Sequence, residues 1–452
     1  MSTLATVTGR LTKRQAYSRA QRLKTWLDRL VLVVLLLAFM GAAASYSTTV
    51  YLRIALGRSP YDDFLQHMLF LFAGTLAASV AVWLVNHSRP AKRWLKYVIP
   101  ISFYLSLLLV ALVKLTPWGV TWMGATRGLN IGFFTFQPSE LLKISLVLYL
   151  VQLLCWWRQQ PKNTPLTSKT PPREDRGEDS HLPRWLRNPE GNSSPSHIAK
   201  QGICIIRQGR PSWPELPRRC VVILVLAAGL TAIQPDLGST GIILGSALIT
   251  LFLAGVDWRH LLGLLFILVF IGGSVLLLSP ERYEYAAKRV DTWLHPLDND
   301  DGAAYQITQA RGALAVGGVL GRGFLQSDQK MNRLPLSSKD FVFPILVEEL
   351  GYIGGVAIIG LFLALAWVSM RLAYYCREPF NRTAIAALGL TISLQGLVNI
   401  GTTIGTLPLS GLTLPFFSEG GTSLIVSLAA IGLMYAFSRE ELNREMKQHY
   451  AT

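Results

Sequence analysis

The sequence predicts an all-α integral membrane protein of about ten transmembrane helices, with a long ordered extracytoplasmic loop between the seventh and eighth spans. Hydrophobic residues make up 51% of the chain and charged residues only 15%, whereas soluble domains contain about 25% charged residues. Apolar stretches of roughly 20 residues, the length that crosses a bilayer, recur along the chain. Basic residues collect at alternate ends of these stretches, as they do in multi-pass membrane proteins.

The predicted spans differ in length and in how they begin. The first follows a basic segment, residues 1–29, that has no small-residue cleavage signal, so we expect an uncleaved first helix. The fifth and sixth are short and are separated by Gln234-Pro235-Asp236, and the eighth is long enough to tilt. The spans start near Leu30, Leu65, Tyr97, Glu140, Arg219, Gly238, His260, Phe341, Thr383 and Gly421.

The net charge of +16 raises the question of nucleic-acid binding. If the N-terminus is cytoplasmic, 30 of the 43 Lys and Arg residues lie on the cytoplasmic side and 11 on the other. Eight of those 11 lie in one loop, residues 280–340, where eight Asp and Glu offset them. This asymmetry follows the positive-inside rule of membrane proteins. The basic residues are therefore explained by topology, so we expect membrane lipids and no nucleic acid as partners. An even number of spans places both termini in the cytoplasm.

Composition divides the chain into spans, a linker and a loop. Segment 158–218 is polar, of mixed charge and rich in proline, so we predict a disordered cytoplasmic linker, with a docking site for a partner as the alternative. Loop 280–340 carries aromatic residues and glycines, which predict an ordered cap with short interfacial helices. The predicted organisation is a basic N-terminal segment (1–29), spans 1–4 (30–157), the linker (158–218), spans 5–7 (219–279), the extracytoplasmic loop (280–340), spans 8–10 (341–437) and a cytoplasmic tail (438–452).

The four cysteines, Cys155, Cys204, Cys220 and Cys376, all lie in predicted cytoplasmic loops or at cytoplasmic span ends. No disulfide framework is therefore expected. Neither the cysteines nor the seven histidines show the spacing of metal ligands, so the sequence predicts no metal site, and no cofactor is evident.

Four polar clusters fall on the extracytoplasmic side of the predicted topology: residues 127–143, 234–239, 280–340 and 405–423. Ionisable groups near hydrocarbon are costly unless they are paired or line a wet cavity, so each cluster is a functional hypothesis. The last cluster joins the final two spans through backbone that is rich in proline and glycine. Such non-helical backbone at membrane depth either packs within protein or lines a cavity, and both readings stay open.

Two of these clusters have the pattern of a helix start. In Gln137-Pro138-Ser139-Glu140, the proline suits a first helical turn and Ser139 suits a cap. Glu140 and Lys143 are three residues apart on one helical face and can form an ion pair. Alternatively, the pair only lowers the cost of placing these charges where the span enters the membrane. In the segment from Gln234 to Ser239 we expect a tight turn in which Asp236 caps the sixth helix.

Asp340 lies where a polar loop enters the eighth predicted helix. Partly apolar surroundings would raise the pKa of its carboxyl group and fit it for a general base, whereas a neighbouring cation would oppose that shift. Helix N-capping is the alternative role, because Asp is a favoured cap residue. Farther along, Glu348 and Glu349 fall within the span, and at least one of them should face a polar interior.

These motifs, in this order, closely resemble the SEDS family (shape, elongation, division and sporulation) of bacteria, the FtsW/RodA type. The resemblance runs from the first span to Arg439-Glu440, without the tails and segment 158–218. It implies a ten-span enzyme of the bacterial cytoplasmic membrane that polymerises peptidoglycan glycan strands from lipid II, usually with a class B penicillin-binding protein, the transpeptidase that forms peptide crosslinks. The motifs are Gln137-Pro138-Ser139-Glu140 with Lys143, Gln234-Pro235-Asp236-Leu237-Gly238-Ser239, Tyr305-Gln306, Gly317-Gly318, Asp340-Phe341, Glu348-Glu349-Leu350-Gly351 and Leu414-Pro415.

Within the family, Ser327-Asp328-Gln329-Lys330 followed by Leu334-Pro335 resembles the cell-division branch more than the rod-elongation branch, which stays the alternative. The division branch implies other division proteins as partners and a place at the division septum. Two stretches depart from the family pattern. Residues 335–340 stand where Pro-Glu-Ala-His-Thr-Asp is common, and residues 418–421 have Glu where the family commonly has Tyr.

The resemblance matches Asp340 to the family's essential aspartate, and we assign it as the base for the acceptor hydroxyl. The departing diphosphate needs cations, for which we assign Arg127, Lys143 and Lys330; a divalent cation could assist. A lipid II flippase and a non-catalytic recruiter of the partner enzyme are the alternatives. Catalysis predicts one indispensable carboxylate on the outer face, whereas a flippase predicts essential polar residues through the full membrane depth. The other predicted substrate-binding residues are Gln137, Ser139, Glu140, Gln234, Asp236 and Ser418.

Overall fold

The computed structural model describes most of the chain outside the predicted linker. Segment 158–218 lies outside the described residues except for its ends, and so does Cys204. The other three cysteines are free thiols, as predicted. The described residues are 2–87, 91–117, 119–122, 125–130, 132, 135–159, 218–234, 236–277, 280–296, 302–330 and 339–450.

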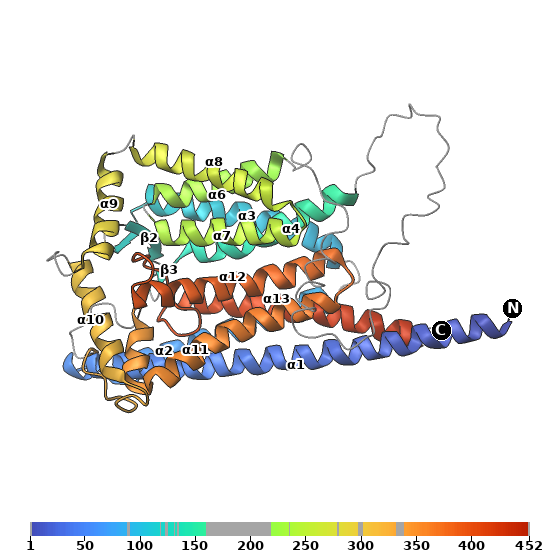
Figure 1. Ribbon diagram of the computed structural model, residues 1–452, viewed down its shortest axis with the longest axis horizontal. Coiled ribbons are helices and arrows are strands. Elements are labelled where there is room, and N and C mark those ends of the chain that lie inside the picture. The colour runs from blue at the N-terminus through green and yellow to red at the C-terminus, as the bar shows by residue number, and fades with distance from the viewer. Residues whose placement is uncertain are drawn as a thin grey trace, which may run out of the picture.

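Long helices run side by side and make up most of the described chain, so the predicted all-α membrane fold is confirmed (Figure 1). In the described part, seven helices are long and apolar enough to cross a membrane, and three more are apolar but shorter. The seven are α1 (Ser2–Ala55), α2 (Asp62–His87), α3 (Ala91–Leu115), α4 (Pro138–Gln159), α11 (Val342–Tyr375), α12 (Pro379–Ile404) and α13 (Gly421–Tyr450); the shorter three lie in α6 (Arg218–Ile233), α7 (Leu237–Leu253) and α8 (Trp258–Leu277).

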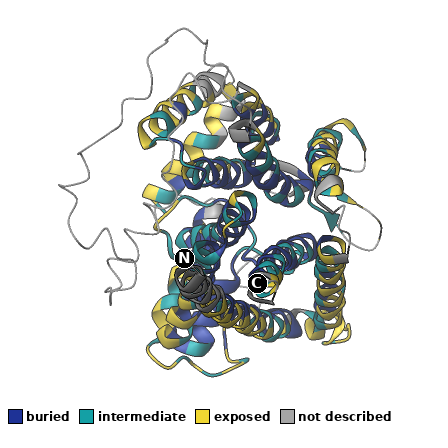
Figure 2. Cartoon of the chain, turned by 90° about the vertical axis from the view of Figure 1, so that its right-hand side faces the viewer, coloured by how far each residue is buried: buried dark blue, intermediate teal, exposed yellow. Residues whose placement is uncertain are grey.

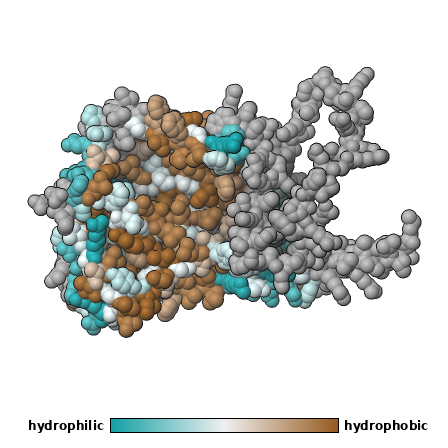
Figure 3. Space-filling view, viewed as in Figure 1, coloured by the Kyte–Doolittle hydropathy of each residue, from teal (hydrophilic) through white to brown (hydrophobic). Residues whose placement is uncertain are grey.

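The two ends of the bundle differ. Helices α9 (Pro280–Leu294) and α10 (Gly302–Gly317) stand across one end, and both chain termini extend toward the other (Figure 1). We call the end with α9 and α10 the cap end. The space-filling view shows a broad hydrophobic band across the middle of the molecule and hydrophilic residues at the cap end (Figure 3). Both helices lie within residues 280–340, the segment for which the sequence predicts an ordered loop.

The cap end also contains a small antiparallel sheet that the sequence did not predict. Its strands β1 (Gly119–Trp122), β2 (Ala125–Asn130) and β3 (Thr135–Phe136) pair in the order β1-β2-β3. The strands are four, six and two residues long, shorter than the runs in which alternating hydrophobicity is a reliable signal. The sheet joins α3 to α4, so it places β2 beside the start of α4.

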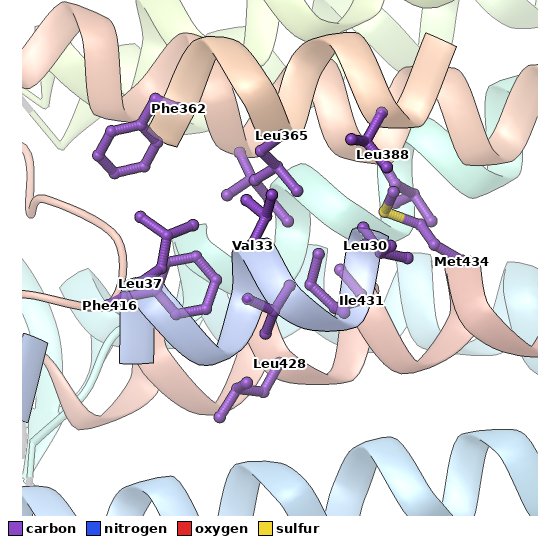
Figure 4. Packing of buried hydrophobic residues seen from close by; sticks show 14 of the residues in the cluster. Leu30, Val33, Leu37, Phe362, Leu365, Leu388, Phe416, Leu428, Ile431 and Met434 are labelled. Carbon is purple, nitrogen blue, oxygen red and sulfur yellow. The ribbon is translucent and has the colours of Figure 1, made fainter. Parts of the chain in front are cut away.

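Buried apolar residues form a large packed core. Looking along the bundle, buried residues face the centre and exposed residues the outside (Figure 2). One cluster joins α1 to α11, α12 and α13, with Leu30, Val33 and Leu37 of α1 at its centre (Figure 4). Small residues permit the closest approaches, as in other membrane bundles: a Cβ at Gly41 would lie 2.0 Å from the carbonyl oxygen of Phe416.

Helix α11 is broken near its start, where Gly351 adopts φ 70° and ψ −175°. The segment that follows α10 fills the break. The amide nitrogens of Arg322 and Gly323 donate to the carbonyl oxygens of Glu348 and Glu349, at 2.9 and 3.0 Å. Two amides beyond the break donate back to this segment. Four of the backbone groups beside the break are therefore bonded, and the segment after α10 is attached to the first turns of α11.

Candidate active site

A polar cavity of about 530 Å³ opens at the cap end and is lined by three of the predicted catalytic and binding residues, Asp340, Arg127 and Gln137. Its walls come from the ends of α1 and α2, from the sheet, from the start of α13 and from the loop before it. The residues that line it are Arg53, Asp63, Gln66, Phe70, Val120, Arg127, Asn130, Gly132, Thr135, Gln137, Lys339, Asp340, Gly411, Thr413, Glu419, Gly420, Gly421, Thr422 and Ser423.

Asp340 is half-buried and directly precedes the N-cap of α11. The N-cap residue is Phe341, and no side chain caps the helix, so Asp340 does not have the capping role that was its alternative. Burial raises the pKa of the Asp340 carboxyl group to about 6, although Arg127 and Lys339 oppose that shift. A carboxylate in this range can take a proton from a hydroxyl group and release it again near neutral pH.

Arg127 reaches the cavity from β2, and its side chain is almost fully buried. One guanidinium nitrogen, Nη1, donates to the carbonyl oxygen of Gly411 at 3.3 Å and lies 3.8 Å from Oδ1 of Asp236. The other two nitrogens, Nε and Nη2, have no hydrogen-bond partner within the described residues. Buried N–H groups of a cation are normally bonded, so this arrangement suits an anionic ligand that completes the set.

The predicted ion pair of Glu140 and Lys143 is present beside the cavity. Nζ of Lys143 lies 2.8 Å from Oε1 of Glu140 and donates to Oε1 of Gln395 at 2.7 Å. The amide nitrogen of Gln395 in turn donates to Thr413, which lines the cavity. Neither charge lines the cavity itself. The pair therefore supports the cavity wall through Gln395, and the ammonium group is already bonded within the protein.

Gln137 is the third predicted residue that lines the cavity; its backbone amide donates to the hydroxyl group of Thr422 at 3.1 Å. Ser139, its near neighbour, does not line the cavity. The hydroxyl group of Ser139 is buried and lies 3.5 Å from that of Ser239. These contacts join the start of α4 to α13 and α7.

The remaining predicted binding residues hold the surrounding backbone and do not line the cavity. Asp236 caps α7, as predicted, by accepting a hydrogen bond from the amide of Ser239 at 3.2 Å. Gln234 donates to the carbonyl oxygen of Val110 in α3. The hydroxyl group of Ser418 accepts a hydrogen bond from the amide of Leu414 at 2.8 Å.

Lys330 lies away from the cavity, between α1 and α11. Its ammonium group is buried, 2.5 Å from Oε1 of Glu349 and 3.3 Å from Oγ of Ser47, and lies over the ring of Tyr51. Burial lowers the pKa of Lys330, and Glu349 opposes that shift. Together with the bond from Ser327 to Glu348, these contacts show that both buried carboxylates of α11 have polar partners. The geometry gives Lys330 no contact with the cavity.

Several cavity residues were not singled out from the sequence. Arg53 and Asp63 form a two-bond ion pair between the ends of α1 and α2, and Lys339 and Glu419 also line the cavity. A signal was present, because Arg53 and Asp63 are charged residues directly beside apolar helices. No group of three or more His, Cys, Asp or Glu side chains able to hold a metal ion lies in the described ranges.

The fold and the cavity together describe a multi-pass helical membrane protein in which a buried guanidinium group and a carboxyl group with a raised pKa line one polar cavity. The model of the FtsW, RodA and SpoVE family, described as "Cell cycle protein", matches residues 28–172 and 196–443. The chain belongs to this family, which confirms the resemblance seen in the motifs.

Named relatives and solved structures agree with the family assignment. The chain is 29% identical over 415 residues to "Stage V sporulation protein E" of Bacillus subtilis, covering 91% of this chain and 96% of that protein. It is 32% identical over 429 residues to "Probable peptidoglycan glycosyltransferase FtsW" of Neisseria gonorrhoeae, covering 93% and 85%.

A chain from the solved structure described as "Structural coordination of polymerization and crosslinking by a peptidoglycan synthase complex" superimposes with a TM-score of 0.63. The two are 25% identical, and the match covers 91% of this chain and 97% of that one. The rod shape determining protein RodA of Thermus thermophilus, 24% identical, has the same fold, with a TM-score of 0.55 and coverage of 91% and 96%.

Proposed function

We propose that this protein is a peptidoglycan glycosyltransferase that polymerises lipid II into glycan strands at the outer face of the bacterial cytoplasmic membrane during cell division. The observation that carries the proposal is that Asp340, a carboxyl group with a raised pKa, shares one cavity with the incompletely bonded guanidinium group of Arg127. Relatives named peptidoglycan glycosyltransferase support the same reaction.

The reaction needs a base and a stabilised leaving group. Asp340 removes the proton from a sugar hydroxyl of one lipid-linked disaccharide as that oxygen attacks the anomeric carbon of the other substrate. The bond from the anomeric carbon to the diphosphate oxygen breaks, and its electron pair leaves with undecaprenyl diphosphate. Arg127 and Lys339 lie where they can stabilise the charge that develops on that diphosphate. A divalent cation, if one assists, would add positive charge at the departing diphosphate.

The proposal also includes the orientation of the protein in the membrane and its branch within the family. The cap end faces away from the cytoplasm, because the positive-inside rule puts both termini on the cytoplasmic side. The relatives named FtsW support the division branch, for which we propose a location at the septum with other division proteins. A class B penicillin-binding protein is the proposed partner, supported by the likeness to a chain of a synthase complex that couples polymerisation to crosslinking.

The proposal is tested with Asp340→Asn in a polymerisation assay that contains purified protein, its penicillin-binding partner and lipid II. The amide keeps the shape of the side chain but cannot accept the proton, so we expect normal membrane assembly and no glycan polymer. Asp328→Asn is the matched control, because Asp328 pairs with Arg322 in the loop and does not line the cavity. Polymer formed by Asp340→Asn at a rate near that of the unaltered protein would refute the assignment of the base.

A further inference from the structure

A second, smaller cavity of about 40 Å³ meets the main cavity at Asp340 and Gly411, and none of the other lining residues is shared. We call it the side chamber. Its walls are formed by α9, α10, the end of α12 and the loop that follows α12. The residues that line it are Arg289, Thr292, Gln306, Ile307, Asp340, Phe341, Asn399, Thr402, Thr403, Leu409, Gly411 and Leu412.

Two buried amide oxygens in the side chamber have no hydrogen-bond donor in the described part of the chain: Oε1 of Gln306 and Oδ1 of Asn399. Their side chains are 5% and 1% exposed. The orientation of Asn399 is fixed, because its Nδ2 group donates to the carbonyl oxygens of Asp340 and Leu412, at 3.1 and 2.6 Å. The side-chain oxygen of Asn399 is therefore the atom that can accept a hydrogen bond from a ligand. Buried oxygens of this kind normally have a hydrogen-bond donor.

The chamber offers mainly acceptors. The hydroxyl groups of Thr402 and Thr403 donate to helix carbonyl oxygens at 2.8 and 3.0 Å, so each has lone pairs left to accept. Arg289 supplies a positive charge at the wall and lowers the pKa of Asp340, which disfavours a metal cation there. A neutral donor fits these groups, and the volume exceeds the roughly 10–15 Å³ that one water needs.

We infer that the side chamber is a water site that carries away the proton Asp340 accepts from the attacking hydroxyl group. The inference rests on the proposed function. The acceptor oxygens of Gln306 and Asn399 hold the chamber water. Protonated Asp340 gives its proton to this water while the water passes one of its own protons to solvent, past the half-buried side chains of Arg289 and Leu409, so the carboxylate is restored and the water stays neutral. Asp340 is then ready for the next addition while the main cavity stays filled with substrate.

The test is Gln306→Leu in the purified complex, with Gln329→Leu as the matched control. Gln329 is also a buried glutamine with an unbonded Oε1, but it lines neither cavity. Gln306→Leu removes one of the oxygens that hold the chamber water, so we expect it to lower kcat about tenfold with KM unchanged. Gln329→Leu should leave kcat and its pH profile unchanged.

Two further measurements separate proton transfer from a structural effect. A small diffusible buffer such as imidazole should restore kcat of Gln306→Leu, because it can replace the missing water, and it should not accelerate the unaltered protein. Infrared difference spectra against Asp340→Asn should show the protonated carboxyl stretch of Asp340 at higher frequency in Gln306→Leu, through loss of a hydrogen bond. This second measurement requires no turnover.

Failure of the relay and failure of the proposed function give different results. Inactive Asp340→Asn together with a Gln306→Leu that matches Gln329→Leu in kcat, buffer response and infrared spectrum would overturn the relay alone. A loss of kcat in Gln306→Leu that buffer does not restore, with the infrared band unmoved, would also overturn it. An Asp340→Asn variant that still forms polymer would overturn the proposed function, and the relay with it.

Discussion

Neutralising either member of the Glu140–Lys143 pair should destabilise the protein far more than neutralising both. The charges are 2.8 Å apart, and both side chains are almost fully buried. At an effective dielectric constant of about 20, two unit charges at this distance attract by roughly 6 kcal/mol. Removing one partner leaves the other charge buried without compensation, and measured costs for such single changes are about 3–5 kcal/mol.

The double variant Glu140→Gln, Lys143→Met removes both charges together. It still leaves Oε1 of Gln395 without the donor it has from Lys143, so we expect a residual cost of about 1–3 kcal/mol. The two single effects should therefore exceed the double effect, with a coupling free energy of several kcal/mol.

The assay is reversible unfolding of the purified protein in mixed micelles with increasing dodecyl sulfate, applied to the single and double variants. Lys114→Met serves as the matched control, since Lys114 is exposed near the end of α3 and its loss should change the unfolding free energy by less than about 1 kcal/mol. Additive single effects would refute the coupling. A double variant that folds normally and still fails to polymerise would show that the pair also has a role in the reaction.

Three further predictions follow from the cavity, the loop and the linker. Activity should fall about tenfold per pH unit below about pH 6, because Asp340 is protonated there. Lys339→Met should move this acidic limb of the pH–rate profile to higher pH, because Lys339 lowers the pKa of Asp340. Gly321→Ala should impair folding more than Gly318→Ala in a thermal-stability assay: both glycines have positive φ, but a Cβ at Gly321 would lie 2.1 Å from a carbonyl oxygen of α11, whereas a Cβ at Gly318 meets nothing within 4 Å. Deleting residues 165–210, predicted from composition to be a cytoplasmic linker, should leave lipid II polymerisation intact in detergent; loss of polymerisation by a well-folded deletion protein would contradict the predicted topology.

Features set by local chemistry were predictable from the sequence. The apolar stretches predicted the membrane-spanning helices, because the thickness of the bilayer fixes the length of a span. The three-residue spacing of Glu140 and Lys143 predicted their ion pair. Asp is a favoured N-cap residue, and this preference predicted that Asp236 caps a helix. The small sheet was not predictable, because its strands are held by pairing with one another and carry too few residues for a period to appear.

Lys330 illustrates the limit of assigning a role from residue type and predicted topology. It was assigned to the departing diphosphate because that group needs cations and Lys330 lies in the predicted extracytoplasmic loop. In the fold its ammonium group pairs with Glu349, between α1 and α11. A buried carboxylate needs a compensating charge, and a single sequence does not show which cation supplies it. Arg53 and Asp63 were missed for the same reason, because their importance depends on which helix ends meet.

The contacts of Lys330 nevertheless bear on Asp340. The segment after α10 fills the break of α11 with backbone hydrogen bonds, while Ser327 and Lys330 bond the side chains of Glu348 and Glu349. Each of these contacts would leave a buried polar group unbonded if the segment moved away from the helix. We therefore expect the segment after α10 and the first turns of α11 to move together. Asp340 directly precedes those turns, so we expect a partner that displaces this segment to displace the proposed base as well.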